Sequence, residues 1–113
     1  MRLGMPQRVR YEVNVIVPPT YSREELVAVL ADAARKTLRT RSDARAVGVF
    51  AYSSSALIGK GWDRGRALTS IDGQGWTGDR SFAPIARTQL DLGRIYLTLG
   101  TTLALGEQIE VDR

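Results

Sequence analysis

The hydrophobic pattern of the first 40 residues changes its period across a pair of prolines. From residue 8 to residue 17, four valines and a tyrosine occupy the odd positions, and Arg8, Arg10, Glu12 and Asn14 lie between them. This alternation predicts a strand with one buried face and one solvent-exposed face. Pro18 and Pro19 end the strand, because neither has an N–H to donate to a strand ladder. Beyond them the apolar residues recur at helical spacing, so the strand is followed by a helix.

The helix is predicted over residues 23–39. Ser22 and Glu25 form a capping box, in which each side chain satisfies a backbone N–H of the first turn. Leu26 and Leu30 begin an apolar stripe that continues along one face of the helix. The basic residues of the last turn suit the negative end of the helix dipole.

Residues 44–53 are predicted to form a central strand. Both of its alternating sets are mostly apolar, as in a strand that is covered on its two faces. Strand, helix and strand within about 45 residues fit a right-handed β-α-β unit if the two strands run parallel.

The remaining elements are predicted to be β-strands joined by turns. Residues 66–71 read as a short strand, 72–75 as its glycine-rich turn, and Trp76 as the start of the returning strand. Residues 82–92 fit either a short helix or an extended segment, and the C-terminal region fits two strands around a turn near Gly106 and Glu107. We therefore expect a single α+β domain over residues 1–113. One principal helix, at about 23–39, packs on a mostly antiparallel sheet of four to six strands, with a β-α-β start followed by hairpins.

The absence of cysteine and histidine restricts the chemistry of this 113-residue chain. It removes disulfides, thiolate nucleophiles, the commonest metal ligands and the side chain best suited to proton transfer near neutral pH. We expect a non-catalytic protein with no cofactor and no metal. A hydrolase that pairs one of the serines 53–55 with Lys60 is a remote alternative.

No apolar run is long enough to span a membrane, so we expect a cytoplasmic protein without a membrane partner. The mature fragment of a secreted precursor would have the same sequence.

The most unusual segment covers residues 59–79, where glycines separate basic and aromatic side chains. Such a loop can bring backbone N–H groups, guanidinium groups and indole faces to a ligand or protein partner. The alternative is a glycine-rich turn in which the tryptophans belong to the core. Asp63, Asp72 and Asp79 lack the spacing of a calcium loop and fit turns better. The predicted binding residues are Lys60, Trp62, Asp63, Arg64, Arg66 and Trp76.

A second functional prediction rests on basic residues elsewhere in the chain. The net charge is +4, and residues 1–66 carry 12 basic and six acidic side chains. A patch of this sign can bind nucleic acid through its phosphates with little base specificity, although the modest net charge and the lack of a known motif disfavour it. The residues of this alternative are Arg8, Arg10, Arg35, Lys36, Arg39, Arg41 and Arg45. The long C-terminal β segment also predicts a homodimer through an edge strand.

Overall fold

The computed structural model describes residues 9–72, 76 and 93–113. Within them the secondary-structure elements follow one another in the order β1 (Arg10–Ile16), α1 (Arg23–Thr40), β2 (Ala46–Tyr52), the short 3-10 helix η1 (Ser55–Leu57), β3 (Gly65–Ser70), β4 (Arg94–Gly100) and β5 (Leu105–Asp112).

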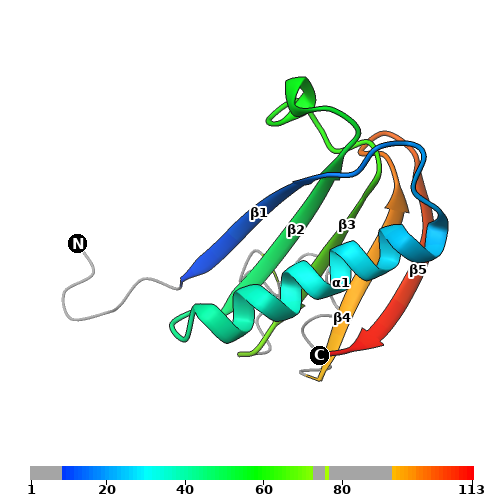
Figure 1. Ribbon diagram of the computed structural model, residues 1–113. Helices are drawn as coiled ribbons and strands as arrows, with labels where there is room; N and C mark the ends of the chain where they lie inside the picture. Colours follow the sequence, from blue (N-terminus) through cyan, green and yellow to red (C-terminus); the bar gives the residue numbers. More distant parts are fainter. Residues whose placement is uncertain (1–8, 73–75, 77–92) are drawn as a thin grey trace.

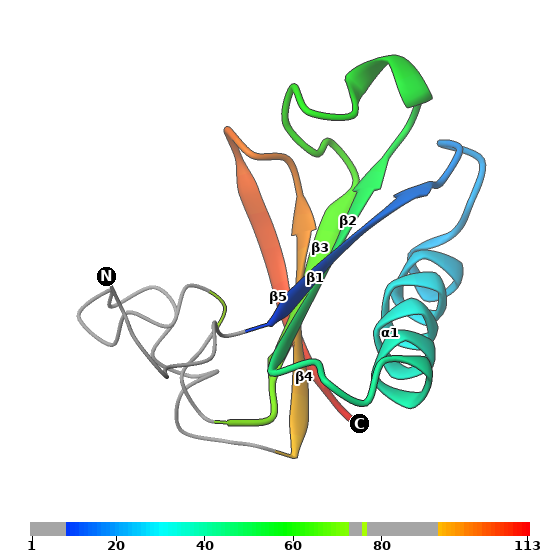
Figure 2. The same ribbon diagram turned by 90° about the vertical axis from the view of Figure 1, so that its left-hand side faces the viewer.

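The five strands form one sheet whose spatial order is the order of the chain, β1-β2-β3-β4-β5. β1 and β2 are parallel, and every later neighbour is antiparallel. Helix α1 makes the crossover between the two parallel strands and lies on one face of the sheet (Figures 1 and 2). The predicted α+β class, with its β-α-β start, following hairpins and mostly antiparallel sheet, is confirmed.

The first two elements form for the reasons visible in the sequence. β1 alternates between exposed and half-buried residues along its whole length. At the start of α1, Ser22 Oγ accepts a hydrogen bond from the Glu25 N–H, and the Glu25 carboxylate accepts one from the Ser22 N–H. The predicted capping box is therefore present, and α1 begins one residue after Ser22.

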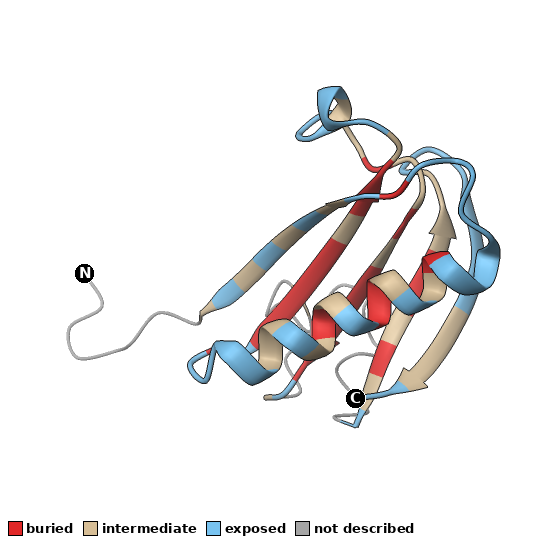
Figure 3. Ribbon diagram, viewed as in Figure 1, coloured by how far each residue is buried: buried red, intermediate tan, exposed pale blue. Residues whose placement is uncertain are grey.

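The core lies between α1 and the covered face of the sheet. Figure 3 shows the buried residues concentrated along β2, β3 and the inner side of α1. Leu26, Leu30 and Ala34 of the helix face apolar residues of the sheet. The sheet supplies Val47, Val49, Ala51, Ala67, Ile95 and Leu97, all buried. β2 is buried almost throughout, as predicted for a central strand.

One glycine sets how closely the helix approaches the sheet. Gly65 has a φ of +156°, and a Cβ there would lie 2.9 Å from the Thr98 carbonyl oxygen and 3.3 Å from Leu30 Cδ1. A side chain at this position would push on the backbone of β4 and on the helix together. The bare backbone of Gly65 therefore lets Leu30 sit directly on the sheet.

The turn predicted near Gly106 and Glu107 is wrong. Residues 101–104 join β4 to β5, and Gly106 lies within β5. The turn is fixed by Gly100, whose φ is +125°, and by Thr101 Oγ1, which accepts a hydrogen bond from the Ala104 N–H at 2.9 Å. The β4–β5 register shifts beside Gly100, so the regular parity of the leucines ends there.

The prediction that Trp76 begins a returning strand is also wrong. Trp76 lies in a turn, and the next described strand after β3, which pairs with it antiparallel, is β4. Among the other predicted features, the turn at 73–75 and the segment 82–92 lie outside the described residues, as do Arg8 and Asp79.

A matched pair of leucines tests where the stability of the fold resides. Leu30 is fully buried and Leu103 is 98% exposed. Leu30→Ala is expected to reduce the free energy of unfolding by about 2–5 kcal/mol, because it removes buried methyl groups and leaves a cavity. Leu103→Ala removes the same atoms from solvent-exposed positions and is expected to change it by less than about 0.5 kcal/mol. Urea denaturation followed by circular dichroism measures both, and equal losses would contradict the core described here.

Candidate functional site

The sheet face opposite α1 carries the side chains that alternate with the core residues. Figure 2 shows that the helix covers the other face only. Phe50 and Arg66 are register partners on this second face, between β2 and β3. On the other side of β3, the register partner of Arg66 is Thr98 of β4. The strand register therefore places an arginine beside an aromatic ring in the middle of the sheet.

Trp62 lies four residues before Arg66 in the chain and is only 7% exposed. The Thr102 N–H and Oγ1 both donate to the Trp62 carbonyl oxygen, each at 2.9 Å, so the segment is attached to the β4–β5 turn. The Arg66 guanidinium carbon lies 5.5 Å from the centre of the Trp62 ring. The indole thus supports a cation through a cation–π contact instead of presenting an open face to solvent.

Arg66 is a half-buried cation without a carboxylate partner among the described residues. Burial lowers the pKa of its guanidinium from the ordinary value, because the charged form loses water. The Nε atoms of Arg64 and Arg66 are both buried and have no hydrogen-bond partner among the described residues. Unsatisfied buried donors are uncommon in folded proteins, so this pair needs a physical explanation.

Trp76 forms a second cation–aromatic group on the same face. Its ring makes an edge-to-face contact with Phe50, with 6.0 Å between ring centres. The Arg10 guanidinium lies 4.9 Å from the Trp76 ring centre and donates to the Trp76 carbonyl oxygen at 3.0 Å. Gly48 leaves room for these rings, since a Cβ there would lie 3.1 Å from the Trp76 ring. Phe50 therefore lies between the two groups.

Asp63 anchors the loop that leads to Trp62. Its carboxylate accepts hydrogen bonds from the Ser53 N–H at 2.8 Å and from Ser53 Oγ at 2.5 Å. Burial opposes ionisation of this carboxyl, but the bonds from Ser53 outweigh it, so the pKa of Asp63 lies below its ordinary value. Asp63 therefore has a structural role within the loop.

The other loop residues are separated from one another. Lys60 is exposed, between Gly59 and Gly61, which both have positive φ values. Ser54 Oγ accepts from the Ala56 N–H at the start of η1. In the described part of the chain, no hydrogen bond joins Lys60 to a serine of the 53–55 segment, and no group of three or more acidic residues is placed to hold a metal ion.

The basic residues of the nucleic-acid alternative are divided between different parts of the molecule. Arg35 pairs with Asp32 at 3.1 Å and donates to the Asp112 carbonyl oxygen, at the β5 edge. Lys36 and Arg41 lie at the opposite edge, beside β1. Arg39 and Arg45 are exposed, and Arg10 contacts Trp76. Nucleic-acid binding by this set stays a prediction.

Comparison of the chain with protein-family models, with curated proteins and with solved structures found no match. Within residues 9–72, 76 and 93–113, no helix is both long and apolar enough to cross a membrane. A functional proposal therefore rests on the geometry of the sheet face opposite α1.

The structure adds two residues that the sequence prediction missed, Phe50 and Gly48. Both lie in the central strand, and the even parity of Phe50 already places it on the face opposite the core valines. The register between β2 and β3, which brings Phe50 beside Arg66, depends on pairing between distant residues and has no local signal in the sequence.

Asp63→Asn tests the anchoring of the loop and its pH dependence. The variant is expected to lose about 1–3 kcal/mol of stability, because Ser53 loses a charged acceptor. The carboxyl pKa is lower in the folded state, so its contribution is present above the unfolded-state pKa, about 3.9, and is lost as the pH falls through the folded-state pKa. The free energy of unfolding of the wild type should therefore fall more steeply than that of Asp63→Asn as the pH falls below about 5.

Urea denaturation at a series of pH values measures this difference. Asp32→Asn, which removes an exposed carboxylate from α1, is the control. Parallel pH profiles of the wild type and Asp63→Asn would contradict an anchoring role for Asp63.

Proposed function

We propose that this protein is a non-catalytic binding module that captures an anionic group of a protein partner or small ligand. The binding site is the Trp62–Arg66 surface, which consists of Trp62, Arg64 and Arg66. The ligand group is an oxyanion, a carboxylate or a phosphate, and it binds the guanidinium groups on the second face of the sheet.

The observation that carries this proposal is the half-buried, unneutralised Arg66. Desolvating a guanidinium costs free energy unless an opposite charge or hydrogen-bond acceptors replace the lost water. The described part of the chain supplies the Trp62 ring but no carboxylate. A bound oxyanion would supply the missing charge, and perturbed ionisable groups of this kind are concentrated at functional sites.

Arg64 and Arg66 are placed to act on one ligand. The Arg64 N–H donates to the Ala51 carbonyl oxygen at 3.1 Å, directly before β3 begins at Gly65. Arg64 and Arg66 flank Gly65, and the Nε atom of each is buried without a hydrogen-bond partner among the described residues. Two neighbouring planar guanidinium groups can bind a carboxylate or phosphate through paired hydrogen bonds, which a lysine could not reproduce.

The surface is also held in place before any ligand binds. Thr102 holds the Trp62 carbonyl group, and Ser53 holds the Asp63 side chain between Trp62 and Arg64. Such preorganisation lowers the entropy that a ligand must offset on binding. The lack of histidine and cysteine in the sequence favours binding over proton transfer or nucleophilic chemistry at this surface.

The test is an NMR titration with inorganic phosphate and with acetate at constant ionic strength. The chain has two tryptophans, so the two indole N–H signals distinguish Trp62 from Trp76. The wild type is expected to show a saturable shift of the Trp62 signal. Arg66→Gln is expected to weaken binding about tenfold or more, because a charge-assisted hydrogen bond contributes roughly 1.5–3 kcal/mol.

Two further variants make the result specific. Arg39→Gln removes the same charge from an exposed position on α1 and should bind as the wild type does. Arg66→Lys keeps the charge but loses the planar fork, so it should bind with intermediate affinity. No saturable shift in the wild type, or equal weakening in Arg39→Gln and Arg66→Gln, would refute the proposed function.

A further inference from the structure

The two edges of the sheet differ in how their backbone groups are used. β1 and β5 are the outer strands, and each is paired along one side only within the described sheet. An unpaired strand edge is a template for another strand, because its N–H and C=O groups point outward in a regular row. The state of each edge therefore decides where a partner can add to the sheet.

The C-terminal half of the β5 edge is capped by arginine side chains. Directly after β5, the Arg113 N–H donates to the Gly93 carbonyl oxygen, so the backbone groups of odd-numbered residues in this part of β5 point toward β4. The carbonyl groups of the even-numbered residues Glu110 and Asp112 therefore point away from β4. The Asp112 carbonyl oxygen accepts from Arg35 Nη2 at 2.7 Å and Nε at 3.2 Å. The Glu110 carbonyl oxygen accepts from Arg94 Nη2 at 3.2 Å. A strand that approached this edge would have to displace both arginines.

The β1 edge has no such cap. The Val17 N–H donates to the Tyr52 carbonyl oxygen, and the Val9 carbonyl oxygen accepts from the Arg45 N–H, each at 2.8 Å. The backbone N–H and C=O groups of the odd-numbered residues of β1 therefore point toward β2. The intervening residues direct their N–H and C=O groups away from the sheet, and no described residue bonds to these groups. They are Arg10, Glu12, Asn14 and Ile16, all exposed.

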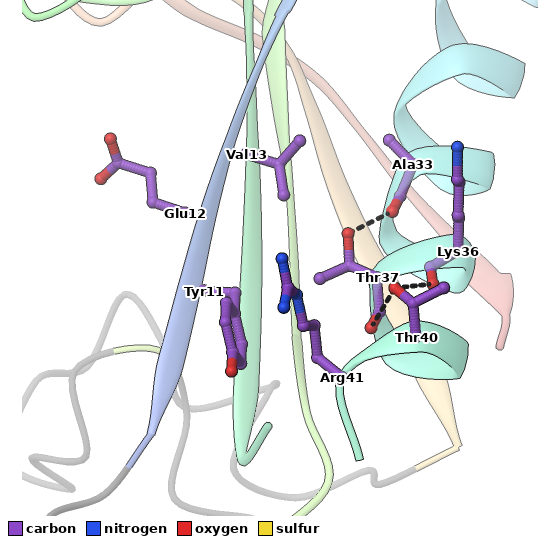
Figure 4. Close-up of a pocket in the computed structure, with 8 residues that line it drawn as sticks. All are labelled: Tyr11, Glu12, Val13, Ala33, Lys36, Thr37, Thr40 and Arg41. Atoms are coloured by element: carbon purple, nitrogen blue, oxygen red, sulfur yellow. Dashed lines mark hydrogen bonds between the residues drawn. The ribbon is translucent and has the colours of Figure 1, made fainter. Parts of the chain in front are cut away.

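A groove of about 420 Å³ runs beside this edge, between β1 and the C-terminal half of α1 (Figure 4). It is lined by Tyr11, Glu12, Val13, Ala33, Lys36, Thr37, Thr40 and Arg41. Figure 1 shows the C-terminal end of α1 lying beside the beginning of β1. The hydroxyl groups of Thr37 and Thr40 donate to carbonyl groups of their own helix, so these donors are already used.

The charges at the groove favour an acidic occupant. Lys36 and Arg41 line its helix side, and neither is paired with a carboxylate among the described residues. Arg41 lies 5.4 Å from the centre of the Tyr11 ring, whose hydroxyl donates to Asp43 at 2.7 Å. Glu12 is the acidic residue of the lining. It alternates with Tyr11 and Val13 along β1, so its side chain lies on the sheet face opposite the helix.

We propose that the β1 edge binds an extended acidic segment of a partner protein, which adds a strand to the sheet beside β1. Backbone hydrogen bonds to Glu12, Asn14 and Ile16 hold the segment, and its carboxylates on the helix side of the sheet pair with Lys36 and Arg41. Strand addition of this kind draws affinity from the main chain and specificity from alternate side chains. The site is separate from the Trp62–Arg66 surface and does not depend on it.

A second copy of this chain fits the groove less well. Its β1, added antiparallel in a continuous sheet, would direct Tyr11, Val13 and Val15 toward the helix side. These side chains carry no carboxylate, so Lys36 and Arg41 would stay unpaired. Charge complementarity therefore selects an acidic partner segment over self-association.

The first test uses two fluorescent peptides matched in length to β1, one alternating Glu with Val and the other alternating Lys with Val. The acidic peptide is expected to bind saturably, and the basic peptide about tenfold more weakly or not at all. Amide hydrogen exchange with the acidic peptide should slow at Glu12, Asn14 and Ile16, whose N–H groups point outward. Slowed exchange at these positions distinguishes strand addition from binding by charge alone.

Matched variants separate the backbone from the charge. Asn14→Pro removes one outward N–H and is expected to weaken binding about tenfold or more, while Gln108→Pro makes the corresponding change at the β5 edge and should leave binding unchanged. Lys36→Glu combined with Arg41→Glu should reverse the preference toward the basic peptide. Arg39→Glu combined with Arg45→Glu makes the same charge change outside the groove lining and should keep the preference for the acidic peptide. The charge variants decide the matter if Asn14→Pro does not fold.

Three results would overturn the proposal. The first is acidic-peptide binding without slowed exchange at the β1 amides. The second is a single-stranded oligonucleotide that binds more tightly than the acidic peptide and displaces it, which would assign these basic residues to phosphate binding. The third is a dimer by light scattering, with the same amides protected before any peptide is added, which would assign the β1 edge to a second copy.

Discussion

The contact between Leu30 and the bare backbone at Gly65 determines how the two layers of this protein meet. Because no side chain stands at Gly65, α1 can lie directly on β3 and cover the odd-numbered residues of the neighbouring strands. A strand has only two faces, so the residues of the other parity are committed to the opposite side. The cation–aromatic groups on that side, Arg66 with Trp62 and Arg10 with Trp76, follow from this assignment of faces.

The elements that were predictable from sequence are those with strong local signals. β1 has a strict alternation ended by two prolines, and α1 has a capping box directly before its apolar stripe. The prediction for the β4–β5 turn is wrong because leucines continue at odd positions through the turn. The position of the turn depends instead on the positive φ at Gly100 and on the hydrogen bond from the Ala104 N–H to Thr101 Oγ1. Leu103 and Leu105 share the parity of core residues yet are exposed, so alternation alone does not identify burial near a turn.

The candidate site was predictable in composition but not in arrangement. The glycine-rich segment did indicate that Trp62, Arg64 and Arg66 are unusual neighbours, and the structure brings Trp62 and Arg66 into contact. It separates Lys60, which is exposed, and gives Asp63 a structural bond to Ser53. These distinctions depend on the register of β2 with β3 and on contacts with the β4–β5 turn, which join residues far apart in the chain. The hydrophobic alternation fixes the face of each side chain, but the residues that stand opposite one another also depend on the geometry of the connections between the strands.

The unequal edges of the sheet also limit how this protein can polymerise. A fibre made by strand addition needs two complementary open edges on each molecule, so that the last strand of one can join the first strand of the next. Here Arg35 and Arg94 bond to the outward carbonyl groups of Asp112 and Glu110 in β5, and no described residue bonds to the outward groups of β1. The C-terminal half of β5 is therefore the less favourable edge for strand addition, which disfavours an open-ended filament.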